Sequence, residues 1–221
     1  MHRFNHLALV PAATFPTQLT QILAIQHILS TGLAPHNIQL LGDSKGGNLI
    51  IQLISHILHL VADVPTLSLA LPFSNVLLIS PWVCLFPKAE GSIVTNSGND
   101  LLSIPASLHL ASFVRECTPE AGYLYLDLLN APEVWFDDIA KVASEMLITA
   151  GNNESLRDTI TVFAKRILEV HPRATLILQA DGIHDDPLFD FVVPSPKTIG
   201  SLTPHIVDSL ANDWNDGYFR A

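Results

Sequence analysis

The sequence is poor in charged side chains, and most of those it has are acidic. Asp, Glu, Lys and Arg make up 14% of the 221 residues, against about 25% in an average soluble domain. The 21 acidic and 11 basic residues leave a formal net charge of -10. This is the wrong sign for binding a phosphate backbone or an anionic membrane surface, so we expect no nucleic-acid partner.

Cysteine is also scarce, since Cys84 and Cys117 are the only two. Neither belongs to a Cys-x-x-Cys or a Cys-His pattern, so the sequence predicts no disulfide framework and no metal site. The apolar run 7–10 stops at Pro11 and is too short for a signal peptide. The C-terminus carries no clear peroxisomal signal. We therefore expect a cytoplasmic protein in a reducing compartment.

No uninterrupted apolar run is long enough to predict a membrane span. The most apolar stretch, 49–64, carries Gln52, His56, His59 and Asp63 at steps of four, three and four. This spacing predicts a polar stripe on one face of a packed helix. Because no third ligand lies nearby, we interpret the two histidines as part of a solvated stripe rather than as a metal site.

The chain is rich in apolar side chains, at 48%, and alternates short apolar runs with longer helical patterns. This alternation predicts an α/β fold with a mostly parallel sheet and flanking helices. We expect a single domain over 1–221, with a helical cap insertion at 83–143 and a loop at 180–196. The expected strands are 38–41, 76–79, 145–150 and 174–179, and the expected helices are 18–31, 47–64, 155–170 and 199–212.

Residues 42–46 read Gly-Asp-Ser-Lys-Gly and match the pattern G-x-S-x-G between an expected strand and an expected helix. A chance match somewhere in the chain has a probability of about 0.07 from average composition. In this position the glycines allow a sharp turn that exposes the serine hydroxyl, and the helix N-terminus favours developing negative charge. Ser44 is therefore a candidate nucleophile, with a structural glycine turn as the alternative.

A serine nucleophile of this type requires an acid and then a histidine later in the chain, each in a loop after a strand. Both are present. Glu154 and Asp158 follow the expected strand 145–150, and His184 follows the expected strand 174–179. Ligands of parallel sheets lie beyond the carboxyl ends of the strands, so these residues are expected on the same edge as Ser44.

With this motif and this order of residues, the chain resembles the α/β-hydrolases of the hormone-sensitive-lipase-like group, and in particular fungal members that hydrolyse small esters. The resemblance implies that Ser44 is the nucleophile, His184 the general base and acid, and Glu154 the acid that orients His184. It also implies that the backbone N–H of Lys45 is an oxyanion donor and that no cofactor is required. The segments that carry it are 15–19, 42–48, 79–82, 150–158 and 182–184.

Each of these roles has a less specific alternative. Asp158 is the second candidate for the acid, and Glu154 could instead complement the dipole of the helix that follows it. A histidine in a loop is often only a hydrogen-bonding residue. The His184-Asp185 pair also occurs in metal-dependent phosphohydrolases, but that fold is all helical and does not match the alternating pattern.

The resemblance also implies segments that precede the first helix in the family and are missing here. These include several strands and an H-G-G-[GA] loop that supplies a second oxyanion donor, whereas no glycine occurs before Gly32. We therefore expect an N-terminally shortened hydrolase with impaired activity. We also expect the apolar residues Leu7, Leu9, Val10 and Phe15 to lack their usual cover, so that the chain pairs with another copy or with another protein.

The sequence thus predicts a serine hydrolase that cleaves a carboxylic ester of a small hydrophobic substrate. The resemblance adds a tailoring step in secondary-metabolite or toxin biosynthesis. The alternative is a catalytically weak or inactive relative that serves as a binding or pathway partner.

Overall fold

The computed structural model describes residues 12–192 and 199–218. Leu7, Leu9 and Val10 lie outside the described residues. The expectation that Phe15 lacks cover was wrong, because Phe15 is buried and its ring stacks on Tyr125. Within the described residues, β1 (Gln39–Asp43), β2 (Phe73–Ile79), β3 (Ala143–Gly151) and β4 (Ala174–Gln179) form one parallel sheet in the order β1-β2-β3-β4. The four expected strands are confirmed, each with its end shifted by no more than a few residues.

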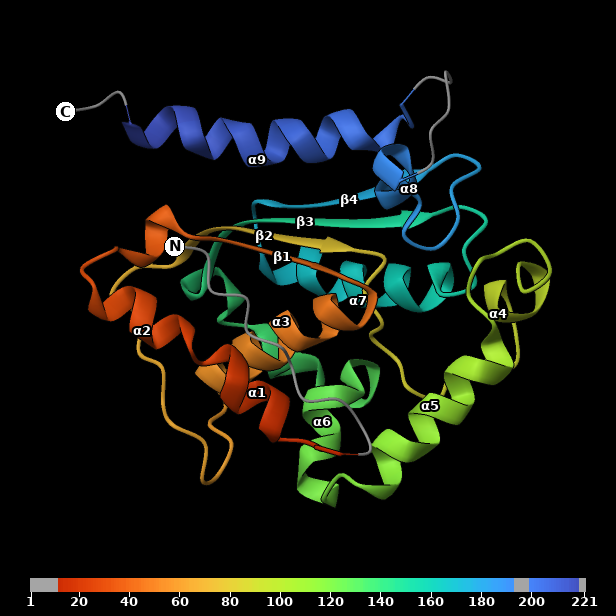
Figure 1. The fold of residues 1–221 in the computed structure, drawn as a ribbon, viewed down its shortest axis with the longest axis horizontal. Coiled ribbons are helices and arrows are strands. Elements are labelled where there is room, and N and C mark those ends of the chain that lie inside the picture. Colours follow the sequence, from red (N-terminus) through yellow and green to blue (C-terminus); the bar gives the residue numbers. More distant parts are fainter. Residues whose placement is uncertain (1–11, 193–198, 219–221) are drawn as a thin grey trace.

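Helices cover both faces of this sheet (Figure 1). On one face lie α3 (Ser44–Leu58) and α7 (Arg157–Val170), and on the other lies α9 (Leu202–Tyr218). Strand β2 is buried over most of its length because it has neighbours in the sheet on both sides and helices on both faces. The expected α/β architecture with a parallel sheet is therefore confirmed.

The remaining elements are short and surround this frame. Between β2 and β3 the chain forms a run of helices, one of which, α6, packs against α3. These elements are α1 (Thr17–Ile22), α2 (Ile25–Ser30), α4 (Ser92–Thr95), α5 (Ile104–Glu116), α6 (Tyr123–Leu126), α8 (Asp186–Val192) and the 3-10 helices η1 (Pro35–Asn37), η2 (Glu120–Gly122), η3 (Leu128–Asn130), η4 (Glu133–Phe136) and η5 (Ile139–Lys141).

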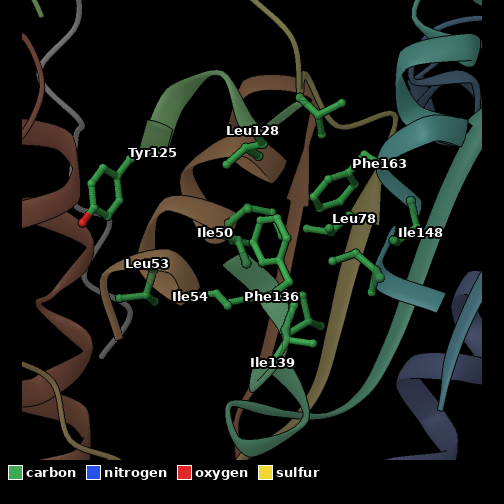
Figure 2. Packing of buried hydrophobic residues seen from close by; sticks show 14 of the residues in the cluster. Ile50, Leu53, Ile54, Leu78, Tyr125, Leu128, Phe136, Ile139, Ile148 and Phe163 are labelled. Carbon is green, nitrogen blue, oxygen red and sulfur yellow. The ribbon is translucent and has the colours of Figure 1, made fainter. Parts of the chain in front are cut away.

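The main hydrophobic core lies between the sheet and the helices α3 and α7 (Figure 2). Phe136 from η4 meets Phe163 of α7 edge to face, with ring centroids 5.6 Å apart. Both rings are essentially inaccessible to solvent. A smaller cluster on the opposite face joins Leu77 and Leu147 of the sheet to Leu202 of α9. The segment between β2 and β3 therefore contributes to the core of the sheet domain.

The polar stripe expected on the helix 47–64 differs from the structure in two ways. First, α3 ends at Leu58, so Asp63 lies beyond it. Second, Gln52 and His56 are buried, and the ring of His56 hydrogen-bonds to the backbone of Val61 and Pro65. The interpretation as a solvated stripe was wrong, because the chain after α3 and the segment between β2 and β3 cover this face.

Three further expectations about element boundaries differ from the structure. The last helix, expected over 199–212, is α9 over Leu202–Tyr218. The single helix expected over 18–31 is split into α1 and α2, because the backbone bonds change from four-residue to three-residue spacing at Ala24. The loop expected over 180–196 contains α8, which begins at Asp186 and continues through Pro187. A proline near a helix start is favourable because its fixed φ suits the first turn.

None of the helices within the described ranges combines the length and the apolar character that crossing a bilayer requires.

The aromatic pair gives a direct test of the core. Phe163→Ala removes a fully buried ring and leaves a cavity, so we expect the free energy of unfolding to fall by about 3 to 5 kcal/mol. The neighbouring Val162 is 47% exposed on the same helix. Val162→Ala should therefore change stability by less than about 0.5 kcal/mol. Urea denaturation followed by circular dichroism measures both, and equal effects would contradict the proposed packing.

Candidate active site

Three strands deliver polar side chains to one edge of the sheet. Ser44 follows β1 directly, Glu154 lies just beyond β3, and His184 lies in the loop after β4. Because the strands are parallel, their carboxyl ends meet at the same edge. The structure thus brings together the three residues that the sequence selected.

Ser44 sits at a strained turn between β1 and α3. Its φ angle is +45°, in the left-handed region that non-glycine residues rarely adopt. The turn is tight enough that a Cβ on Gly42 would lie 2.6 Å from the backbone of Gly46. The Ser44 carbonyl accepts a hydrogen bond from the Trp82 N–H at 2.9 Å. The sharp turn expected from the glycines is therefore present.

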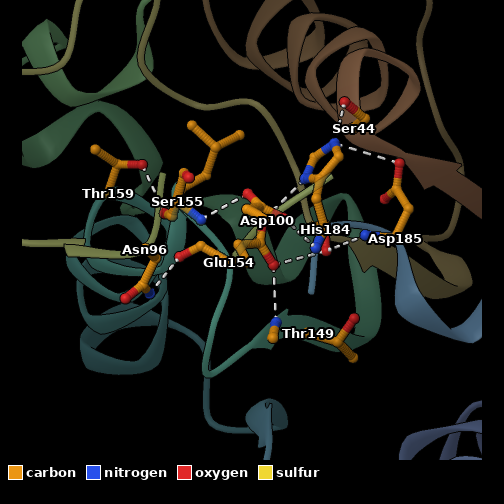
Figure 3. A network of polar contacts seen from close by, with 12 residues as sticks. Ser44, Asn96, Asp100, Thr149, Glu154, Ser155, Thr159, His184 and Asp185 are labelled. Atoms are coloured by element: carbon orange, nitrogen blue, oxygen red, sulfur yellow. Dashed lines mark hydrogen bonds and ion pairs between the residues drawn. The ribbon is translucent and has the colours of Figure 1, made fainter. Parts of the chain in front are cut away.

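The three side chains form a continuous chain of hydrogen bonds (Figure 3). The His184 Nε2 lies 2.9 Å from the Ser44 Oγ, and the His184 Nδ1 lies 3.0 Å from the Glu154 Oε1. Glu154 is fully buried and the His184 ring is almost so. With the Nδ1 proton directed at Glu154, a neutral His184 ring presents its Nε2 lone pair toward the Ser44 hydroxyl.

Two further donors hold the Glu154 carboxylate. Its Oε2 accepts a hydrogen bond from the Gly151 N–H at 2.8 Å and another from the Ser80 hydroxyl at 2.8 Å. Ser80 was not predicted from the sequence as part of the site, although it follows β2 at the same edge and has a φ angle of +43°. A buried carboxylate needs such donors in place of water.

Asp158, the second candidate for the acid, makes different contacts. Its carboxylate accepts the Ser92 N–H at 2.8 Å and pairs with Arg157 at 2.9 Å. Partial burial would raise its pKa, but these hydrogen bonds and the Arg157 charge outweigh burial and lower the pKa. Between the two acids that the sequence left open, Glu154 is the one in contact with His184.

The loops that carry Glu154 and His184 touch through their backbones. The Asn153 N–H donates to the Gly182 carbonyl at 2.8 Å, and the Asn152 N–H donates to the Gln179 carbonyl at 2.9 Å. A Cβ on Gly151 would lie 2.3 Å from the Gly182 carbonyl oxygen. Only glycine therefore allows this close approach at position 151, and the approach fixes the distance between acid and histidine.

Asp100, from the segment between α4 and α5, connects the same two loops. Its Oδ1 accepts the His184 N–H at 2.9 Å and its Oδ2 accepts the Ser155 N–H at 2.8 Å. Asp100 was not predicted from the sequence as part of the site, because the turn-rich segment around it has no pattern that indicates a distant partner. The segment between β2 and β3 thus helps to position the site.

The surroundings of His184 are acidic. Burial alone would lower its pKa, but the hydrogen bond to Glu154 and the negative charges of Asp185, Glu154 and Asp100 raise it above its ordinary value. The Asp185 Oδ2 lies 3.3 Å from the same Nε2 that contacts Ser44. His184 Nε2 is therefore close to two oxygen atoms at once.

Lys45, the expected oxyanion donor, occupies the first turn of α3. Backbone N–H groups in a first turn have no acceptor within the helix, so the Lys45 N–H remains available to a ligand. Its side chain turns away to contact the Asn48 Oδ1 at 3.0 Å and the Trp82 ring at 5.2 Å. Burial lowers the pKa of the Lys45 ammonium to about 8, although the charge of Asp127 opposes this.

An apolar cavity of about 220 Å³ begins beside Lys45 and Gly46. Its wall is formed by the start of α1, one face of α3, the end of α5 and α6, with Phe15, Leu49, Val114 and Leu126 among the lining residues. Within the described residues, no group of three or more His, Cys, Asp or Glu side chains is arranged to hold a metal ion.

The parallel sheet and the serine at the turn after β1 define an α/β-hydrolase fold. Solved esterases share this fold. An esterase/lipase from an uncultured bacterium aligns with 20% identity and a TM-score of 0.70, over 93% of this chain and 63% of that one. The carboxylesterase EstE1, cloned from a metagenomic library, gives 20% identity and a TM-score of 0.69, over 95% and 66%. Carboxyl esterase 2 from the fungus Tuber melanosporum aligns with 19% identity and a TM-score of 0.62, over 80% of this chain and 56% of that one.

The chain belongs to the steryl acetyl hydrolase family, whose model matches residues 7–193. A relative in Schizosaccharomyces pombe, mug81, is named as a candidate steryl acetyl hydrolase. It is 27% identical over 178 residues, which cover 77% of this chain and 45% of that protein. The chain thus spans less than half the length of this relative.

The Asp100 bridge can be tested by its effect on stability. Asp100→Asn replaces one carboxylate oxygen by an NH2 group that faces a backbone N–H, so at least one of the two hydrogen bonds is lost. We expect the free energy of unfolding to fall by about 1.5 to 3 kcal/mol, the usual range for hydrogen bonds to a charged group. Asp137→Asn, at an exposed position, is the control. Equal urea midpoints for the two variants would contradict the bridge.

Proposed function

We propose that the protein hydrolyses a carboxylic ester, with Ser44 as nucleophile, His184 as general base and acid, and Glu154 as the residue that orients His184. The observation that carries this proposal is the position of the His184 ring, 2.9 Å from the Ser44 hydroxyl and 3.0 Å from the Glu154 carboxylate. Nucleophile, base and orienting acid in mutual contact are the requirement for nucleophilic acyl transfer.

In the proposed first step, the Ser44 Oγ attacks the carbonyl carbon of the ester while the His184 Nε2 takes its proton. Glu154 stabilises the imidazolium that forms, and the Lys45 N–H donates to the oxygen that becomes negative. When the tetrahedral intermediate collapses, the C–O bond breaks and His184 returns the proton to the leaving alcohol. An acyl group remains on Ser44.

In the second step, a water molecule takes the place of the alcohol. His184 removes one of its protons as the water oxygen attacks the acyl carbon, and then protonates the Ser44 oxygen as the acid leaves. Every proton transfer therefore passes through the His184 Nε2.

The chemistry of the cavity supports a hydrophobic substrate. Its lining is mostly apolar, and it begins at the residue after Ser44. The family's description as steryl acetyl hydrolases agrees with the acetyl ester of a bulky apolar alcohol, and we propose this substrate class. The resemblance to fungal tailoring hydrolases supports the narrower proposal of a role in secondary-metabolite or toxin biosynthesis.

Self-association remains part of the proposal. In the described sheet β1 is an edge strand, and Leu41 on it is 47% exposed. Unpaired edge strands and exposed apolar side chains favour pairing with a second chain.

A cytoplasmic location, as expected from the sequence, is also proposed.

Labelling with a fluorophosphonate probe tests the nucleophile. Ser44→Ala should abolish labelling and lower the hydrolysis of p-nitrophenyl acetate by at least ~10³-fold, because it removes the hydroxyl that would form the acyl-enzyme. Ser97→Ala, at an exposed serine, should leave both unchanged. A folded wild-type protein that neither labels nor hydrolyses esters would favour the non-catalytic alternative.

The proposed role of the cavity in substrate binding can be tested by filling it with a larger side chain. Val114→Trp should lower kcat/KM for an ester with a bulky apolar group by at least ~10-fold, while the value for p-nitrophenyl acetate changes by less than about threefold. Val94→Trp places the same side chain at an exposed position outside the cavity lining. If the two variants show the same selectivity as the wild type, the cavity does not receive the substrate.

A further inference from the structure

Asp185 follows His184 directly and turns its carboxylate back toward the histidine ring (Figure 3). Its Oδ2 lies 3.3 Å from the His184 Nε2, and its Oδ1 is buried without a hydrogen-bond partner. The backbone of Asp185 has a φ angle of +55°, and its N–H donates to the Ser80 hydroxyl at 3.1 Å. This hydrogen bond restrains the backbone from which the Asp185 side chain projects.

The contact with Nε2 has a consequence for where protons reside. When the Nδ1–H of His184 is directed at Glu154, a neutral ring presents a lone pair at Nε2. An ionised Asp185 would then face this lone pair with no proton between them, which is repulsive. The 3.3 Å contact is favourable only if a proton lies on Asp185 or on the Nε2.

Either location of that proton removes His184 from its role as a base. A proton on Asp185 is donated to the Nε2 lone pair and competes with the Ser44 hydroxyl for it. A proton on the Nε2 makes the ring an imidazolium, which cannot accept the Ser44 proton at all. His184 can accept the Ser44 proton only after His184 and Asp185 have lost the proton that lies between them.

We propose that Asp185 is a positioning residue that shares one proton with His184 and so determines the pH at which His184 becomes available to Ser44. This inference rests on the proposed function of His184 as the base. It adds a fourth residue to the hydrogen-bonded side chains of Ser44, His184 and Glu154, and this residue sets the lower pH limit of the reaction.

The other charged groups around the pair act in the same direction. Asp43 faces it from the end of β1, Asp100 from the segment before α5 and Glu154 from the loop after β3, and all three are acidic. Asp186, the next residue, instead accepts a hydrogen bond from the Gln179 side chain. Burial raises the pKa of Asp185 to about 7, His184 opposes this, and the neighbouring carboxylates add to it. The pair is thus expected to keep its proton near neutral pH.

Asp185→Asn is the informative variant. Asn has nearly the same shape, tolerates a left-handed φ better than most residues and keeps the N–H that binds Ser80. It cannot hold the negative charge. Asp181→Asn is a matched control, because Asp181 lies in the same loop with a φ angle of +56° and is exposed.

The first measurement is the pH profile of kcat/KM for p-nitrophenyl acetate. In Asp185→Asn the acidic limb should move down by at least about one pH unit, the usual effect of removing a charge this close. At pH 6 the variant should therefore be more active than the wild type, with plateau values at high pH within about threefold. An unchanged limb, or an equal loss of activity at every pH, would overturn the proposal.

The second measurement separates this inference from the proposed function. The titration of His184, followed by NMR with ring-labelled histidine and assigned by the loss of its signal in His184→Asn, does not depend on catalysis. Its midpoint should fall in Asp185→Asn and stay the same in Asp181→Asn. If the wild type shows no esterase activity but this shift is present, the proposed function fails and the shared proton stands. If the midpoint does not move, the shared proton is refuted whatever the activity.

Discussion

The arrangement of the site depends on one buried carboxylate. Glu154 has no contact with solvent, and a carboxylate in such surroundings is stable only where hydrogen-bond donors replace the water it has lost. Its donors are the Gly151 N–H, the Ser80 hydroxyl and the His184 ring. These donors come from the ends of β2 and β3 and from the loop after β4. Satisfying one side chain therefore requires three strand ends to meet, and the same meeting places His184 against Ser44.

Much of this arrangement is predictable from the sequence. The apolar runs predicted all four strands, and the glycines around Ser44 predicted the sharp turn, because both signals are local. The chain order of Ser44, Glu154 and His184 then assigned them to one edge of the sheet. The roles of Asp100 and Ser80 were not found, because each contacts residues that are distant in the chain. Asp185 adjoins His184, but adjacency in the sequence does not show that its carboxylate turns back toward the ring. Such contacts leave no periodic pattern.

The polar residues on α3 show more clearly what a periodic sequence pattern does not predict. Spacing places Gln52 and His56 on one face of a helix, but it does not say what covers that face. The structure covers it with the loop after α3 and with Trp135, whose ring stacks on His59 and whose indole N–H donates to the Ser55 hydroxyl. Polar side chains are compatible with burial where backbone groups satisfy them, as Pro65 and Val61 do for His56. A polar stripe therefore indicates a specific set of partners as readily as it indicates solvent.

The Asp100 bridge makes two backbone amides into reporters of a motion. The amides of His184 and Ser155 lie 84 and 55 residues from Asp100 in sequence and are held by its two carboxylate oxygens. Neither amide can exchange its hydrogen with solvent until that bond opens. If the segment between β2 and β3 separates from the sheet as a unit, both amides should lose protection at the same rate. Their exchange would then measure how often this segment detaches, at two sites within the loops that carry the acid and the histidine.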